Sequence, residues 1–229
     1  MSAADEFTKD DIDRAYQKLG HRWGWSFMAT PEERLRTARV AIVGLNPGGG
    51  GEGDNSAFGL LWNSDGVNAY YDEKWGADGR SDNPLQKQVK EWHRLLQLNP
   101  QDPLCAQFVP FRSPTFSKLA NSEESVEFAR DLWRWVLSVS PATLFVTMGK
   151  LPARYLAQTM SARYISRLPT GWGRQMIDVY DSPDGKRIIA MPHPSRYRIF
   201  ARGGGVSDTA EGSFMAAADS SNALPVHGQ

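Results

Sequence analysis

The sequence predicts an α/β protein, a three-layer α/β/α sandwich with a central, mainly parallel four-stranded sheet. Three observations lead to this prediction. Short apolar runs rich in β-branched residues alternate with longer segments whose apolar residues recur every three or four positions. The short runs are apolar on both faces, as strands are when helices cover both sides of a parallel sheet. Strands and helices also alternate along the chain, which favours right-handed crossovers between parallel strands.

Each strand and helix is expected from its own run of residues. The four parallel strands are expected at residues 39–43, 105–109, 144–148 and 187–191, with a possible extra strand at 176–180. Helical spacing of apolar residues predicts helices at 10–19, 84–98, 122–138 and 152–160. Residues 53–80 are rich in Gly, Asn and Asp and are expected to form a long loop.

The length and composition are those of one globular domain. We expect a single α/β domain over residues 1–202 and a disordered tail over 203–229, where Gly, Ala and Ser dominate. The sequence has no apolar run long enough to span a membrane and no signal peptide, so we expect a cytoplasmic protein. Cys105 is the only cysteine, which excludes a disulfide framework, a thiolate zinc site and an iron–sulfur cluster.

The charges are balanced over the whole chain but not within it. The formal net charge is zero, which argues against binding to nucleic acid, because affinity for the phosphate backbone depends on cationic side chains. Residues 150–202, however, hold ten Lys and Arg residues against three Asp residues, a local charge of +7. This segment can form a basic face; the alternative is that the charges are scattered around the domain.

The first expected strand ends in a glycine-rich loop, Gly44-Leu-Asn-Pro-Gly-Gly-Gly-Gly51. Ligands of open α/β sheets bind at the carboxyl ends of the strands, so Asn46-Pro47 is a candidate site. A simple turn is one alternative. Dinucleotide binding is another, because Gly48, Gly50 and Gly53 match G-x-G-x-x-G, but no amphipathic helix opens directly after them. A phosphate-binding P-loop is excluded, because no Gly-Lys-Ser/Thr follows the glycines.

The last expected strand ends in a second polar motif, Pro192-His-Pro-Ser195, followed by Arg196-Tyr-Arg198. A buried strand again delivers a polar side chain, His193, into a loop, and the two flanking prolines restrict its backbone. The alternative is a structural histidine in a proline-rich turn.

Together, Gly44-Leu-Asn-Pro-Gly48 and His193-Pro-Ser195 resemble the two signature motifs of the uracil-DNA glycosylase superfamily. Their order, their separation and their placement after apolar strands agree with it, and the resemblance covers about residues 38–202. The asparagine most resembles the mismatch-specific and single-strand-selective branches. The resemblance implies a monofunctional DNA glycosylase of base-excision repair that removes uracil or a related deaminated or damaged base. It implies no cofactor and no metal, and DNA as the partner; we expect a monomer.

The resemblance also implies roles for individual residues. Asn46 and His193 are the expected catalytic residues: Asn46 holds a water beneath C1′, and His193 donates a hydrogen bond to the pyrimidine O2. Phe58 is expected to stack on the flipped base, with Trp62 as its competitor, and Gln107 to pair with the base edge. The expected substrate-binding residues are Gly44, Leu45, Pro47, Gly48, Phe58, Gln107 and Ser195. The expected DNA-binding wedge is Arg196, Tyr197 and Arg198.

Two other functional classes remain open. One is a non-catalytic module on the same fold that binds nucleic acid or a nucleotide, and the other is an enzyme that acts on a free nucleoside. Other enzyme classes find little support, because there is no G-x-S-x-G nucleophile motif and the four histidines have no metal-ligand spacing. No lysine adjoins either motif, although Lys150 follows the Gly149 turn, so we expect no Schiff base with the sugar.

Overall fold

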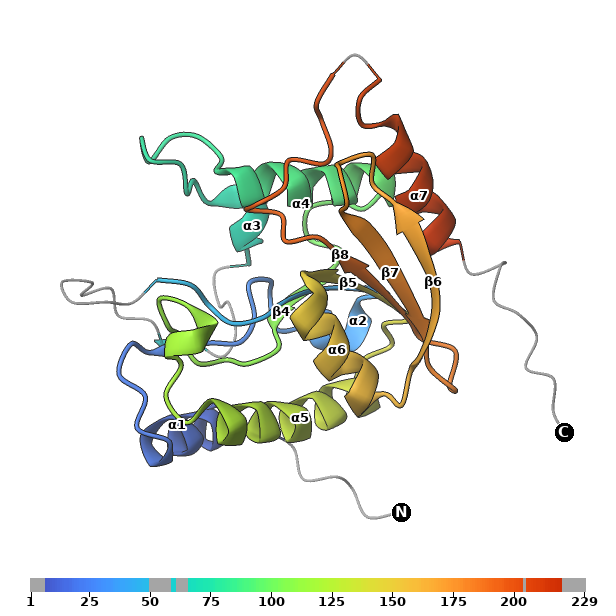
Figure 1. Cartoon of the computed structure of the whole chain (residues 1–229). Coiled ribbons are helices and arrows are strands. Elements are labelled where there is room, and N and C mark those ends of the chain that lie inside the picture. The colour runs from blue at the N-terminus through green and yellow to red at the C-terminus, as the bar shows by residue number, and fades with distance from the viewer. Residues whose placement is uncertain (1–6, 50–58, 61–65, 204, 220–229) are drawn as a thin grey trace, which may run out of the picture.

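A computed structural model describes residues 7–49, 59–60, 66–203 and 205–219 (Figure 1). The described chain is an α/β fold with a central mixed sheet of six strands in the order β4-β2-β5-β8-β7-β6. The strands are β2 (Val40–Gly44), β4 (Leu104–Gln107), β5 (Leu144–Met148), β6 (Arg163–Pro169), β7 (Met176–Asp181) and β8 (Arg187–Met191). A short parallel pair, β1 (Trp25–Ser26) and β3 (Gly59–Leu60), lies outside this sheet.

The prediction of a four-stranded sheet is wrong in strand number. The four apolar runs do form the parallel strands β2, β4, β5 and β8. The possible extra strand is β7, which is antiparallel to β8, and β6 continues the sheet antiparallel to β7. Strand β6 is an edge strand with mostly exposed side chains, including Tyr164, which is 52% exposed. Its sequence therefore lacks the apolar run by which the buried strands were predicted.

Helices cover both faces of the sheet in two layers (Figure 1). Buried side chains of one helical group share a core with one face: α1 (Lys9–Lys18), α2 (Arg34–Thr37), α5 (Ser122–Val139) and α6 (Lys150–Thr159). The second core joins the other face to α3 (Ala69–Asp72), α4 (Pro84–Leu95) and α7 (Asp208–Ala218). A 3₁₀ turn, η1 (Phe116–Lys118), precedes α5. Among the described residues, no helix is long and apolar enough to cross a membrane.

Two segments expected to be irregular contain helices. The predicted 53–80 loop includes α3, and the predicted disordered tail includes α7. Ala210, Phe214 and Ala217 of α7 are buried, and the Phe214 ring meets that of Phe200 edge to face at 5.8 Å. The spacing of these three residues is helical, but Phe214 is the only large one, and the Ala, Ser and Gly around it gave a composition that resembles disorder. The folded part of the chain therefore extends beyond residue 202.

The strand order determines where the loops gather. From β2 the chain crosses to β4 on one side, and from β4 it returns across β2 to β5 on the other. This reversal places a topological switch point at the carboxyl ends of β2 and β5, where ligands of open α/β sheets bind. The segments that follow β2, β4, β5 and β8 all start at this edge because these strands are parallel.

Candidate functional site

The loop after β2 is held against the segment after β4. The Phe108 N–H donates to the Gly44 carbonyl at 2.8 Å, and the Val109 N–H donates to the Leu45 carbonyl at 2.8 Å. The Ser113 N–H donates to the Pro47 carbonyl at 3.3 Å. The pairing of β2 and β4 thus continues past both strands, and the first motif has a fixed backbone rather than that of an isolated turn.

The side chain of Asn46 is oriented by three acceptors. Its Nδ2 donates to the Ser113 hydroxyl at 2.9 Å and to the carbonyls of Phe111 and Pro47, each at 3.2 Å. Of the two polar atoms of this amide only the nitrogen can donate, so the two carbonyl acceptors identify it as Nδ2 and the other atom as Oδ1. Oδ1 has no hydrogen-bond partner among the described residues. The partly buried Asn46 therefore presents an open acceptor.

The Arg112 side chain binds the backbone of the glycine loop. Its Nε donates to the Gly48 carbonyl at 2.8 Å, and the residue is only 8% exposed. Gly49 has φ +79°, and a Cβ there would lie 2.5 Å from Nη2 of Arg112. The backbone angle favours glycine at position 49, and a Cβ there would also displace the Arg112 guanidinium. A guanidinium charge therefore lies directly under the loop, while Gly48 and Gly49 are exposed above it.

Gln107 lies across the end of β2. It pairs in register with Gly44, and a Cβ on Gly44 would lie 2.1 Å from Oε1 of Gln107. Nε2 of Gln107 donates to the Tyr70 hydroxyl at 2.8 Å. Burial raises the pKa of Tyr70, so its hydroxyl stays a neutral phenol. The amide expected to read the base is thus positioned by α3 and is only partly buried.

His193 follows β8 with its ring tautomer defined by Ser195. Nδ1 of His193 accepts from the Ser195 backbone N–H at 3.3 Å and lies 2.8 Å from the Ser195 hydroxyl. A backbone N–H can only donate, so Nδ1 is the acceptor and the proton of the neutral ring is on Nε2. Burial, and next the charge of Arg196, lower the pKa of His193. The ring is therefore a neutral Nε2–H donor at pH 7.

The segment that follows His193 is anchored by α4. Oε1 of the buried Gln88 accepts the backbone N–H groups of Ile199 and Phe200, both at 2.9 Å, and its Nε2 donates to the Phe200 carbonyl at 3.1 Å. The turn after β5 lies against the histidine ring, because a Cβ on Gly149 would be 3.7 Å from Cδ2 of His193. The imidazole is thus positioned from two neighbouring elements.

The structure brings most of the predicted site residues to one edge of the sheet. Asn46 and His193 follow β2 and β8, which are separated by β5, so two inter-strand spacings of about 10 Å in total lie between them. Of the predicted wedge, Arg196 and Arg198 are exposed, whereas Tyr197 is partly buried against the core under α4 and α7. Phe58 and Trp62, the two candidates for base stacking, lie outside the described residues.

Five residues that support the site are not among the predicted catalytic, substrate-binding or DNA-binding residues, although the resemblance extends over residues 109–115 and Gly149: Tyr70, Gln88, Arg112, Ser113 and Gly149. Arg112 and Ser113 follow the strand that ends near Gln107, so their position after a buried strand was an available signal. Tyr70 and Gln88 reach the site from helices through tertiary contacts. No motif or periodicity in the sequence marks such contacts.

Lys150 follows the Gly149 turn and has a perturbed pKa. Its Nζ donates to the carbonyls of Met176 at 2.5 Å and Ala190 at 2.9 Å, and pairs with Asp178 at 2.9 Å. Burial lowers the pKa of Lys150, and Asp178 opposes this. All three ammonium protons therefore have acceptors that tie α6 to β7 and β8.

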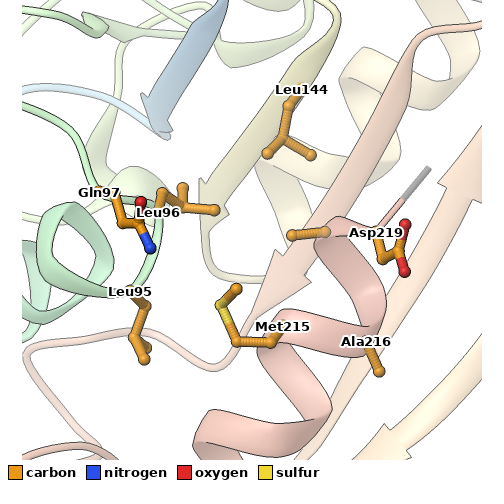
Figure 2. A pocket seen from close by; sticks show the side chains of 8 residues that line it. Leu95, Leu96, Gln97, Leu144, Met215, Ala216 and Asp219 are labelled. Atoms are coloured by element: carbon orange, nitrogen blue, oxygen red, sulfur yellow. The ribbon is translucent and has the colours of Figure 1, made fainter. Parts of the chain in front are cut away.

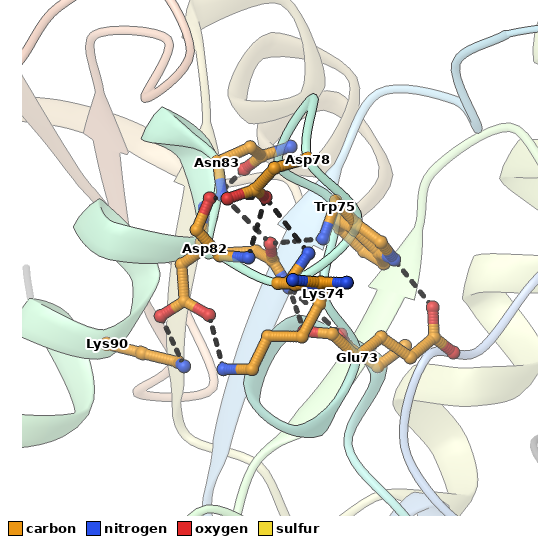
Figure 3. A network of polar contacts seen from close by, with 11 residues as sticks. Glu73, Lys74, Trp75, Asp78, Asp82, Asn83 and Lys90 are labelled. Carbon is orange, nitrogen blue, oxygen red and sulfur yellow. Dashed lines mark hydrogen bonds and ion pairs between the residues drawn. The ribbon is translucent and has the colours of Figure 1, made fainter.

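Two further features lie outside the site. Lys74 and Lys90 both pair with Asp82, at 2.7 and 2.6 Å, in a network that fixes the segment between α3 and α4 (Figure 3). There, the Arg80 and Ser81 N–H groups and the Ser81 hydroxyl lower the pKa of Asp78 to about 2.

A groove of 520 Å³ opens between the end of α4 and α7, lined mainly by apolar side chains such as Leu95 and Met215 (Figure 2). It also includes Leu144, the first residue of β5, so it lies at the opposite edge of the sheet from Asn46. No group of three potential metal ligands occurs in the described part of the chain.

Comparison with protein-family models gave no match to this chain, and neither did comparison with the curated proteins.

Proposed function

We propose that this protein is a monofunctional DNA glycosylase that hydrolyses the N-glycosidic bond of uracil or a related deaminated or damaged base. One observation carries the proposal: Asn46 offers an open acceptor and His193 a neutral N–H donor at the same edge of the sheet. The strand spacing of about 10 Å between them suits one nucleotide taken out of the base stack. Its sugar would face Asn46 and its base would face His193.

The role of His193 follows from its tautomer. When the bond between C1′ and N1 breaks, the electron pair stays with the base and negative charge grows on the pyrimidine O2. The Nε2–H of His193 is directed by Ser195 and can donate to that oxygen without losing its proton. Such a hydrogen bond strengthens as charge develops, so it stabilises the transition state more than the ground state.

The role of Asn46 follows from its free carbonyl. Oδ1 can accept a hydrogen bond from a water, which directs a lone pair of the water oxygen toward C1′. An amide cannot take the proton, so after the bond between oxygen and C1′ forms, the proton passes to solvent or to the departing base. The cationic character of the sugar, rather than a strong base, must therefore supply most of the reactivity.

Lysine chemistry is not needed for this reaction. A bifunctional glycosylase attacks the sugar with an amine, which must be unprotonated and free to move. The Lys150 ammonium is committed to Asp178 and to two backbone carbonyls, which supports water as the nucleophile. We expect no adduct to be trapped when borohydride is added during the reaction.

The proposal is tested with end-labelled single- and double-stranded oligonucleotides that carry one uracil, followed by alkaline cleavage at abasic sites. Cleavage at the uracil position supports the proposal, and a borohydride-trapped adduct contradicts monofunctional action. If uracil stays intact, hypoxanthine, xanthine and alkylated bases are tested next. If all these bases stay intact while DNA is still bound, the protein is a non-catalytic binding module.

A further inference from the structure

The hairpin that joins β6 to β7 reaches the same edge of the sheet as His193. Pro169 of β6 pairs with Met176 of β7, so residues 170–175 form the tip of this hairpin. Because β7 is antiparallel to β8, the start of β7 lies beside the carboxyl end of β8. The tip therefore lies next to the 192–202 segment, on the side of β8 away from Asn46.

The tip has a defined conformation. Thr170 is 1% exposed; its hydroxyl donates to the Gln175 carbonyl at 2.8 Å and accepts the Trp172 N–H at 3.2 Å. Gly171 packs against the first turn of α7, because a Cβ there would lie 3.2 Å from the Cβ of Thr209. The tip is thus supported both from within and by α7.

An arginine from the neighbouring segment stacks on this tip. The guanidinium carbon of Arg202 lies 4.2 Å from the centroid of the Trp172 ring. The backbone N–H of Arg202 donates to the Ser207 hydroxyl at 3.1 Å, and that hydroxyl donates to the Ile199 carbonyl at 3.0 Å. These two bonds hold the backbone of Arg202 in place. A stacked guanidinium keeps its in-plane N–H groups available, and these match the geometry of a phosphate group. Arg202 is exposed and Trp172 is partly exposed.

The basic excess of residues 150–202 concentrates at this place. Four basic residues of this segment pair with its three aspartates: Lys150 and Arg167 with Asp178, Lys186 with Asp184, and Arg187 with Asp181. The tip and the 192–207 segment contain no Asp or Glu. Their arginines, all exposed, are Arg174, Arg196, Arg198 and Arg202.

We propose that the Trp172–Arg202 stack, together with Arg174 and Arg198, forms a binding site for the phosphodiester backbone of a DNA strand. This inference rests on the proposed function, and it adds a contact next to the flipped nucleotide. The strand would pass from the Asn46 loop, over His193, to the hairpin tip. Contacts to phosphates set the position of a protein on DNA without reading its sequence.

The test is the affinity for a fluorescent, uracil-free single-stranded oligonucleotide, measured by anisotropy over a range of salt concentrations. Arg202→Gln is expected to raise Kd roughly tenfold. The logarithm of the association constant falls as the logarithm of the salt concentration rises, and the variant should make this negative slope shallower by about 1. Arg202→Lys keeps the charge but loses the planar guanidinium that stacks on Trp172, so we expect a loss of affinity smaller than that of Arg202→Gln. Trp172→Ala is expected to weaken binding, and Trp172→Phe to restore most of it.

Arg163→Gln is the matched control. Arg163 is an exposed arginine of the same hairpin, but it begins β6 at the opposite edge of the sheet. An equal loss of affinity in Arg163→Gln would show a diffuse charge effect and overturn the proposal. Unchanged affinity in Arg202→Gln and Trp172→Ala would also overturn it, as would failure of the unaltered protein to bind the oligonucleotide.

Excision of uracil, assayed separately with enzyme in excess, distinguishes the two proposals. If uracil is excised and the Trp172 and Arg202 variants still bind the oligonucleotide with unchanged affinity, only the proposed site for the DNA phosphodiester backbone is contradicted. Hairpin-dependent binding without excision of any base would contradict only the glycosylase function.

Discussion

At the scale of single residues, the Asn46 amide is defined by what it donates to. Nδ2 faces two carbonyl oxygens and a hydroxyl, and a hydrogen-bond donor is therefore required at that position. A carboxylate has no hydrogen to donate and would bring negative charge against the carbonyls of Pro47 and Phe111. This local environment accounts for an amide, rather than an acid, at the end of β2.

The variant Asn46→Asp tests this interpretation. We expect it to excise no faster than the unaltered protein, although aspartate is the stronger base, and to lose about 1–3 kcal/mol of stability near neutral pH. The carbonyls raise the pKa of the new carboxyl group, so the loss should shrink as pH falls and the carboxyl becomes a protonated donor. Denaturant unfolding at pH 8 and pH 5 measures this, and a loss that grows toward acid would contradict it.

Gly44 ends β2 and Gly48 lies in the loop that follows, and the two glycines differ in what surrounds them. A Cβ on Gly44 would collide with the Gln107 amide, whereas a Cβ on Gly48 meets nothing within 4 Å. We expect Gly44→Ala to destabilise the protein by about 1–3 kcal/mol, because Gln107 must leave Tyr70. Gly48→Ala should change the free energy of unfolding by less than about 0.5 kcal/mol. Similar melting temperatures for the two variants would refute this difference.

At the scale of elements, α7 is the clearest departure from the sequence-based prediction. The helix covers β7 and β8 and is tied to the start of β8, where Nη1 of Arg187 donates to the Asp219 carbonyl at 2.6 Å. Phe214 and Met215 are neighbours on this helix with opposite environments, since Phe214 is 0% and Met215 42% exposed.

Alanine variants of this neighbouring pair test whether α7 belongs to the cooperative fold. Phe214→Ala should cost about 3–5 kcal/mol because it leaves a cavity against Phe200, and Met215→Ala should cost much less. Urea unfolding of both variants measures the difference. A small effect in Phe214→Ala would mean that α7 docks only loosely on the sheet.

The accuracy of the sequence-based prediction differs between elements for physical reasons. Strands β2, β5 and β8 are apolar on both faces, so burial makes them recognisable, and their ends located Asn46 and His193. Strand β6 is an exposed edge in which Arg163, Ser166 and Arg167 interrupt the apolar residues, so no apolar run marks it. Supporting contacts such as Gln88 with Phe200 join positions far apart in the chain, which a single sequence does not reveal.

At the scale of the whole molecule, buried neutral histidines make the fold sensitive to acid. Burial lowers the pKa of His21 to about 4, and burial is also the main cause of the lowered pKa values of His93 and His193. The His21 ring stacks on Phe111 at 4.2 Å, and its Nε2 lies 3.1 Å from the Ser125 hydroxyl. Protonation of this ring would place a charge inside the core that joins α1 to α5.

The pH window for His21 follows from its pKa values. The unfolded chain takes up this proton near pH 6.5 and the folded chain only near pH 4, so stability is full above about 6.5 and is lost as pH falls toward 4. Between pH 7.5 and pH 5, His21 alone should account for a loss of about 2 kcal/mol. We expect His21→Phe to remove this part of the loss in urea unfolding at the two pH values. An unchanged pH dependence would contradict burial of a neutral His21.

We propose that Asn46 and His193 together break the glycosidic bond. This proposal is tested by the single-turnover rate of uracil release from a labelled oligonucleotide for Asn46→Ala, His193→Ala and Ser195→Ala, with Arg163→Gln as a control. The loss of one transition-state donor costs about 10²–10³ in rate, and we expect a loss of that size for His193→Ala. Asn46→Ala removes the acceptor that positions the water, and we expect a loss of about 10²-fold. A smaller loss is expected for Ser195→Ala, which only orients the imidazole. Folded Asn46→Ala and His193→Ala variants that release uracil at the unaltered rate would refute the catalytic roles of these two residues.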